Sequence, residues 1–165
     1  MADAVHHQIL DLAHTATVAI GLTGIEDARI IKRNIPSIRG YRGTENGDAD
    51  TIDSTAATNH LIILSSYLPE TITAATNLRD DIGYPIQFNL IKRDNQDETT
   101  DPEPVQKWRE QIISTFRNQH LSGVTGAHVF DCRLEPGSSI VPESWKQNFL
   151  ESVFVLRFIT RQARG

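Results

Sequence analysis

The stretch YPIQFNLIK, residues 84–92, carries the clearest structural signal in the sequence. Apolar residues occupy positions 84, 86, 88 and 90, and Pro85, Gln87 and Asn89 stand between them. A period of two is typical of a β-strand, in which successive side chains point to opposite faces. We therefore predict a strand here, with one face in the core and a wetter opposite face.

Three further elements are predicted on the N-terminal side of this strand. Leu61–Leu64 is apolar on both faces, as in a strand that is covered on each side. The segment 28–33 is short, contains β-branched residues and is followed by Pro36. This pattern favours a strand that leads into a loop. The first segment predicts a helix, with Asp3 as N-cap, Gly21 to Gly24 as its end, and apolar residues at helical spacing: Val5, Ile9, Leu12 and Ala16.

Three more elements are predicted on the C-terminal side. Pro102, behind Asp101, suits the first turn of a helix. The apolar stripe of this helix indicates core packing rather than interface anchors, and it consists of Val105, Trp108, Ile112, Ile113 and Phe116. A strand is predicted around His128–Phe130, and a long closing strand at Phe149–Arg161.

The order of these elements predicts the fold class and the domain organisation. The 165 residues, 39% of them hydrophobic, suffice for one modest core, so we predict a single domain over residues 1–165. A helix, strands, a helix and strands favour an α+β fold, a small mostly antiparallel or mixed β-sheet with two packed helices. Long loops are predicted at about 34–59 and 133–145, and such loops in a compact domain are commonly functional.

Charge and cysteine content exclude several classes of protein. The formal net charge of -5 argues against a protein whose main partner is the phosphate backbone of a nucleic acid. Cys132 is the one cysteine, so the chain cannot form an internal disulfide, and a reduced cytosolic origin is expected. No apolar run approaches the ~20 residues that span a bilayer, so no membrane association is expected.

Histidine and cysteine patterns do not complete a metal or catalytic site. His6, His7 and His14 lie near one face of the predicted helix, but zinc needs three or four convergent ligands and no second cluster has ligand spacing. We therefore interpret these histidines as a polar helix face. Cys132 lacks any local nucleophile signature, and a small buried hydrophobic residue is the expected role.

Acidic and glycine-rich stretches also lack a complete motif. The carboxylates of Asp80, Asp81 and residues 94–103 do not follow the calcium-loop pattern, and a solvated acidic turn is the expected structure. The glycines at 40, 43 and 47 are not followed by the Lys-Ser or Lys-Thr of a phosphate loop. We therefore predict no metal, no cofactor and no enzymatic activity.

Arginine residues are the candidates for a functional surface. Arg39, Tyr41 and Arg42 offer a planar aromatic and basic contact surface on the first long loop. Residues near the C-terminus are candidates for salt bridges to a neighbouring subunit or partner, namely Arg157, Arg161 and Arg164. The alternative is that these arginines protect an exposed strand edge against aggregation. Separate basic and acidic faces would also let identical subunits attract head to tail and close into rings.

The stretches YPIQF at 84–88, WREQI at 108–112 and VLRFITR at 155–161, with the final Arg164-Gly165, suggest a family. They resemble small neck proteins of tailed bacteriophages and prophage-like elements, and in particular the tail terminator, or tail-completion protein. The resemblance implies a hexameric ring that caps the tail tube and joins it to the head-tail connector. It also implies that DNA passes through the channel without specific binding, and that the protein assembles in the host cytoplasm and resides in the virion neck.

Two alternatives remain open at this point. Within the same class, the protein is another head-tail connector or a minor tail protein. In a different class, it is a small α/β enzyme or ligand-binding domain, with His60, Tyr67 or Asp80 near a pocket at the strand ends.

Overall fold

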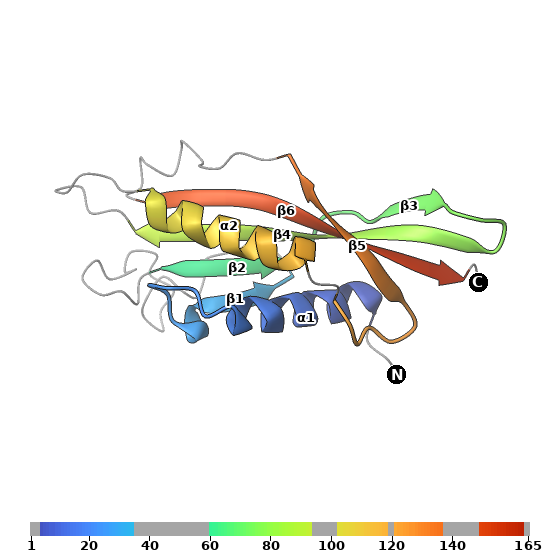
Figure 1. Cartoon of the computed structure of the whole chain (residues 1–165), viewed down its shortest axis with the longest axis horizontal. Helices are drawn as coiled ribbons and strands as arrows, with labels where there is room; N and C mark the ends of the chain where they lie inside the picture. The colour runs from blue at the N-terminus through green and yellow to red at the C-terminus, as the bar shows by residue number, and fades with distance from the viewer. Residues whose placement is uncertain (1–3, 35–59, 94–101, 119–120, 137–148, 164–165) are drawn as a thin grey trace.

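The computed structural model describes residues 4–34, 60–93, 102–118, 121–136 and 149–163 (Figure 1). These residues form two α-helices, one short 3-10 helix and six strands. In chain order they are α1 Val5–Ala19, the 3-10 helix Asp27–Arg29, β1 Ile30–Arg33, β2 Leu61–Ser65, β3 Thr71–Ala74, β4 Arg79–Arg93, α2 Glu103–Asn118, β5 His128–Glu135 and β6 Phe149–Ala163.

The strands form one open sheet in the order β1-β2-β4-β6-β5. β1 and β2 are parallel, and all the other pairs are antiparallel. β4 is long enough to pair with two strands on one side, with β2 along residues 87–91 and with β3 along residues 80–83. The prediction of an α+β fold with two helices on a mixed, mostly antiparallel sheet is therefore confirmed.

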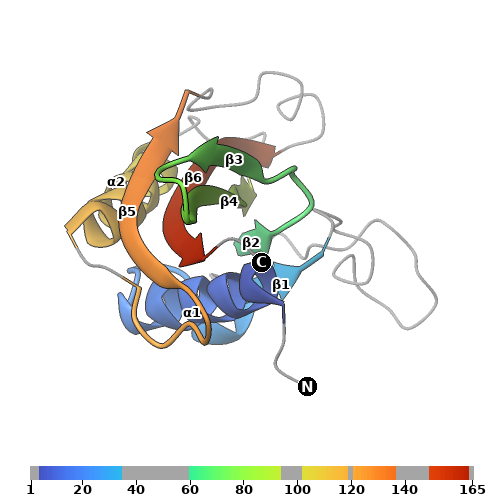
Figure 2. The same cartoon turned by 90° about the vertical axis from the view of Figure 1, so that its right-hand side faces the viewer.

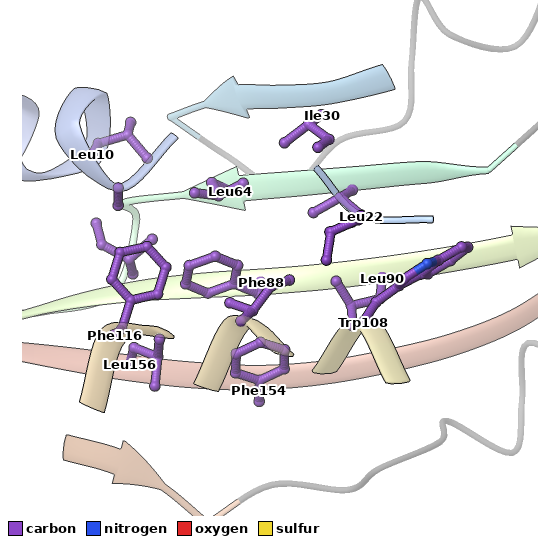
Figure 3. Packing of buried hydrophobic residues seen from close by; sticks show 14 of the residues in the cluster. Leu10, Leu22, Ile30, Leu64, Phe88, Leu90, Trp108, Phe116, Phe154 and Leu156 are labelled. Atoms are coloured by element: carbon purple, nitrogen blue, oxygen red, sulfur yellow. The ribbon is translucent and has the colours of Figure 1, made fainter. Parts of the chain in front are cut away.

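Both helices pack on the same face of the sheet. Viewed end-on, α1 and α2 lie to one side of β4 and β6 (Figure 2). The even-numbered residues of β4 and β6 point toward them, and Phe88 stacks on Phe154 with ring centroids 4.9 Å apart (Figure 3). Trp108 and Phe116 of α2 are buried in the same cluster, which confirms their predicted core role. The opposite side of the sheet is called the helix-free face below.

The prediction that one face of β4 is solvent-exposed is wrong. Gln87 and Asn89 lie on the helix-free face and are each only 8% exposed. A chain of side-chain hydrogen bonds satisfies them. Tyr67 Oη donates to Gln87 Oε1 at 2.7 Å, Gln87 Nε2 to Asn89 Oδ1 at 2.8 Å, and Asn89 Nδ2 to Glu151 Oε1 at 2.8 Å. Burial of these polar groups is tolerable since each has a partner.

The predicted start and stripe of the first helix need correction, whereas its predicted end is confirmed, because the helix stops at Ala19 and Gly21 follows with a positive φ of 68°. Ala4, not Asp3, is the N-cap residue, and no side chain caps the helix. The buried stripe is also rotated relative to the predicted one and consists of Ile9, Leu10, Ala13 and Thr17. Thr17 is accommodated because its hydroxyl donates to the carbonyl of Ala13 at 2.7 Å, which satisfies the buried oxygen within the helix.

Several other boundaries differ from the predictions. β4 begins five residues earlier than predicted, and β3 was not predicted at all. Residues 133–135 belong to β5 and not to the predicted loop, because they pair with residues 155–157 of β6. The remainder of that loop from 137 on, and residues 35–59 of the first loop, lie outside the described residues.

Candidate functional site

Arg161, a predicted interface residue, lies on the helix-free face and is engaged within the chain. Its Nε and Nη2 donate to the two carboxylate oxygens of Asp81 at 2.8 and 3.0 Å. The guanidinium also lies 5.1 Å from the ring centroid of Phe130. The hydrogen bond from Arg161 lowers the pKa of Asp81, and the same contact raises the pKa of Arg161. This bidentate pair ties the ends of β4 and β6 together.

Arg157, the second described candidate, makes a larger set of contacts. Its Nε donates to Glu135 of β5, and its Nη1 donates to Thr71 Oγ1 at 3.2 Å and to the carbonyls of Gly83 at 3.3 Å and Pro69 at 3.4 Å. Its side chain is only 17% exposed. One guanidinium therefore joins β5, β4, β3 and the segment before β3, so we call these contacts the Arg157 clamp.

Gly83 makes room for the Arg157 clamp. A Cβ atom at this position would lie 2.6 Å from Thr71 Oγ1 and 2.8 Å from Arg157 Cδ. Contacts this short would force the arginine or the threonine to move. Gly83 therefore acts as a positioning residue for β3, and no local sequence motif marks it, because the crossing side chain comes from a distant strand.

The charges of this part of the helix-free face are balanced in pairs. Arg133 Nε lies 2.8 Å from Asp131 Oδ2, beside the Arg157–Glu135 and Arg161–Asp81 contacts. Asp131 also accepts a hydrogen bond from the backbone amide of Cys132 at 2.9 Å. Three ion pairs thus connect cations and carboxylates of β4, β6 and β5.

The hairpin formed by β3 and the start of β4, residues 71–83, extends past the ends of both helices (Figure 1). We call it the projecting hairpin. All four residues of β3 are exposed, and the large apolar side chains Ile72 and Leu78 are 68% and 77% exposed. Exposed apolar residues grouped on a protruding element are typical of a protein contact rather than of a folding core.

The histidines of α1 have structural roles in place of the predicted polar face. His6 Nε2 lies 2.9 Å from the carbonyl oxygen of Pro85, and His14 Nε2 lies 2.8 Å from that of Ile30. Both side chains are partly buried, so they attach α1 to β4 and β1, whereas His7 is exposed. Within the described ranges, no group of three or more His, Cys, Asp or Glu side chains could hold a metal ion.

A cavity of about 400 Å³ lies at the start of α2, lined in part by Thr23, His60, Glu103 and Trp108. His60 Nδ1 is buried and has no hydrogen-bond partner in the described structure, and its ring lies 5.3 Å from that of Trp108. Burial lowers the pKa of His60, and the nearby charges of two cations add to this. Trp108 is fixed by a 2.8 Å hydrogen bond from Nε1 to the Thr23 carbonyl.

Of the three residues considered for the alternative pocket, His60 lines this cavity, whereas Tyr67 and Asp80 lie elsewhere. His60 precedes β2, whose first residue pairs with Ile91, whereas Asp80 is eleven positions away on β4, or about 35 Å along the strand. Tyr67 donates a hydrogen bond to Gln87, which lies on β4 between Asp80 and Ile91. Burial also raises the pKa of Cys132 to about 12, so its thiol is not poised as a nucleophile.

The other predicted site residues, Arg39, Tyr41, Arg42 and Arg164, lie outside the described residues. No described helix is long and apolar enough to cross a membrane. No protein-family model matches this sequence, and no curated protein matches it significantly.

Proposed function

We propose that this chain is a structural protein of the phage neck, a tail terminator whose subunits form a ring that caps the tail tube and joins it to the head connector. The observation that carries the proposal is the projecting hairpin. Its side chains are exposed, and Ile72 and Leu78 bury little surface within the subunit. A hairpin of this kind gains stability when another protein covers it.

The rigidity of the hairpin base supports an assembly role. The Arg157 clamp and the Arg161–Asp81 pair both lie where the projecting hairpin joins the sheet. A contact element that is already ordered loses less conformational entropy when it docks than a flexible loop does. The arginines expected to meet a partner therefore support the proposal indirectly, by holding the hairpin in place.

The charge pattern of the helix-free face suits a protein that surrounds passing DNA. The guanidinium groups of Arg133, Arg157 and Arg161 each lie against a carboxylate. Paired in this way, they attract phosphate groups less than isolated arginines would. In this proposal the subunits form a hexameric ring, contact the tube protein and the connector, and catalyse no reaction.

The test is the mass and shape of the purified protein, by light scattering and negative-stain microscopy, with and without purified tail tubes. The proposal predicts discrete rings, free or seated on the ends of tubes. A protein that stays monomeric at high concentration and does not bind tubes contradicts it. Rings that bind the connector but not the tube would assign the chain to another head-tail connector, and its position in the particle would then identify it.

The cavity beside His60 favours a second candidate function, that of a small ligand-binding domain. A buried imidazole nitrogen without a described partner and the adjacent Trp108 ring could together hold a planar polar ligand. A panel of ligands tested by thermal shift checks this, because a ligand at 100 times its dissociation constant stabilises a protein by about 2.7 kcal/mol. Loss of that shift in His60→Ala would place the ligand in the cavity.

A further inference from the structure

Three described strands, β1, β3 and β5, have one side without a partner strand. β1 carries Lys32 and Arg33, and β5 alternates charged and apolar residues. β3 has the sequence TITA, without charge or proline. Natural proteins protect free edges with charges, prolines or bulges, so an edge without any of them is available for pairing with another strand.

Two edges of the sheet match in side-chain character. β3, β4, β6 and β5 lie in this order, which leaves β3 and β5 at opposite edges. Ile72 of β3 is 68% exposed and Leu134 of β5 is 37% exposed. Both point to the helix-bearing face, because Ile72 pairs with Ile82 and Leu134 pairs with Leu156.

Strand direction also permits a contact between identical subunits. All three pairings from β3 to β5 are antiparallel, so strand directions alternate across the four strands. A rotation about a ring axis that runs roughly along the strands keeps this direction in the neighbouring subunit. The β3 strand of one subunit therefore runs antiparallel to the β5 strand of the next.

We propose that β3 of one subunit adds to the outer edge of β5 in the next subunit, with Ile72 directly opposite Leu134. This inference rests on the proposed function, since it names the surfaces through which the ring closes. The same register places Thr73 opposite Arg133 and Ala74 opposite Cys132. Cross-strand apolar pairs on one face stabilise a sheet, and unlike surfaces that meet head to tail generate rings.

The stagger of the strands agrees with a closed sheet. Ile72 is level with Ile82 on β4, whereas Leu134 is level, through Leu156, with Ile86. Along the strand direction, Ile72 and Leu134 are therefore offset by four residues. If they pair between subunits, each subunit adds a register shift of four residues over its four strands, or one residue per strand. Barrels with this ratio of shear to strand number tilt their strands by about 36°, which is a common value for closed sheets.

The irregularity in β5 does not obstruct the proposed pairing. The register shift of β5 lies between Val129 and Asp131, before the stretch 132–135 that would receive β3. A bulge there ends the available edge on one side. It therefore limits the contact to about four residues, which is the length of β3.

Disulfide trapping tests the register. In a Cys132→Ser background, Ile72→Cys combined with Leu134→Cys should cross-link under mild oxidation, because directly opposite residues have Cα atoms about 4.5–5.5 Å apart. Within one subunit the two positions are three strand spacings apart, about 14 Å, and are also offset by four residues along the strands, so any disulfide must join two subunits. The expected product is a ladder of covalent oligomers on a denaturing gel.

The control is Thr73→Cys with Leu134→Cys, since Thr73 points to the other face and should cross-link far less. Assembled protein in which the test pair does not cross-link, or cross-links no more than the control, overturns the edge pairing and leaves the proposed function standing. A protein that is monomeric at every concentration overturns both.

Discussion

β4 and β6 are each 15 residues long and pass through two regions that differ in almost every respect. Along residues 84–91, β4 is buried and its even-numbered side chains pack under both helices. Along residues 79–83 the same strand continues past the helices and pairs with exposed β3. The covered region stabilises the fold by apolar burial, whereas the projecting region is held by hydrogen bonds and ion pairs and leaves Ile72 and Leu78 exposed.

The largest loss of stability is expected from breaking the covered region. Phe88→Ala removes a buried ring that stacks on Phe154 and lies 5.9 Å from Phe116. Truncation of a buried phenylalanine costs about 3–5 kcal/mol, which chemical denaturation can measure. The control Ile72→Ala, in the projecting region, should change the free energy of unfolding by no more than about 0.5 kcal/mol. Equal effects at both positions would contradict the contrast between the regions.

A smaller loss is expected at the base of the projecting hairpin. Gly83→Ala places a Cβ atom against Thr71 Oγ1 and Arg157 Cδ, and crowding of this kind costs about 1–3 kcal/mol. Adding Thr71→Ala removes the nearest clashing atom and should restore part of the loss in urea unfolding. If Gly83→Ala is as stable as the wild type, the Arg157 clamp is looser than described.

Acidification should weaken the covered region through His60. Burial lowers the pKa of His60 in the folded protein. At a pH just below the usual pKa of 6.5, the His60 imidazole is therefore protonated in the unfolded chain but not in the folded one. Stability is therefore fully present above pH 6.5 and falls as the pH decreases toward the folded pKa. The melting temperature of His60→Gln should fall less between pH 7.5 and 5.5 than that of the wild type. Exposed His7→Gln is the control and should behave like the wild type.

The smallest effect on stability is expected at the exposed ion pair of the projecting region. Arg161→Gln removes the bidentate contact with Asp81, and exposed ion pairs contribute little to stability because solvent screens them. A double-mutant cycle with Asp81→Asn measures the coupling, which should decrease at 1 M salt. A coupling as large as the loss caused by Gly83→Ala would show that this pair carries more of the stability than its exposure suggests.

The sequence predicted the covered region well because burial leaves a periodic pattern. The alternation at 84–90 and the stripe of α2 both correspond to side chains that pack between helices and sheet. The polar positions Gln87 and Asn89 misled the prediction, since their partners Tyr67 and Glu151 are distant in sequence.

The projecting region could not be predicted from local patterns. β3 is short and exposed, and it is held by Arg157, which contacts Thr71 across 86 positions of sequence. Arg161 likewise finds Asp81 across 80 positions. The sequence predicted both arginines as candidates for salt bridges to a neighbouring subunit or partner, and the structure assigns them intramolecular partners. Their participation in an interface stays a prediction, as does that of Arg39, Tyr41, Arg42 and Arg164.

We infer that the projecting hairpin serves assembly and not folding. The most direct test is the molar mass in solution, by sedimentation velocity at one protein concentration, of the wild type, Ile72→Lys and the control Asn77→Lys. We expect a ring for the wild type and for Asn77→Lys, an exposed polar position in the turn beyond β3, and a folded monomer of unchanged melting temperature for Ile72→Lys. A wild-type monomer, or an Ile72→Lys variant that still forms the ring, would contradict it.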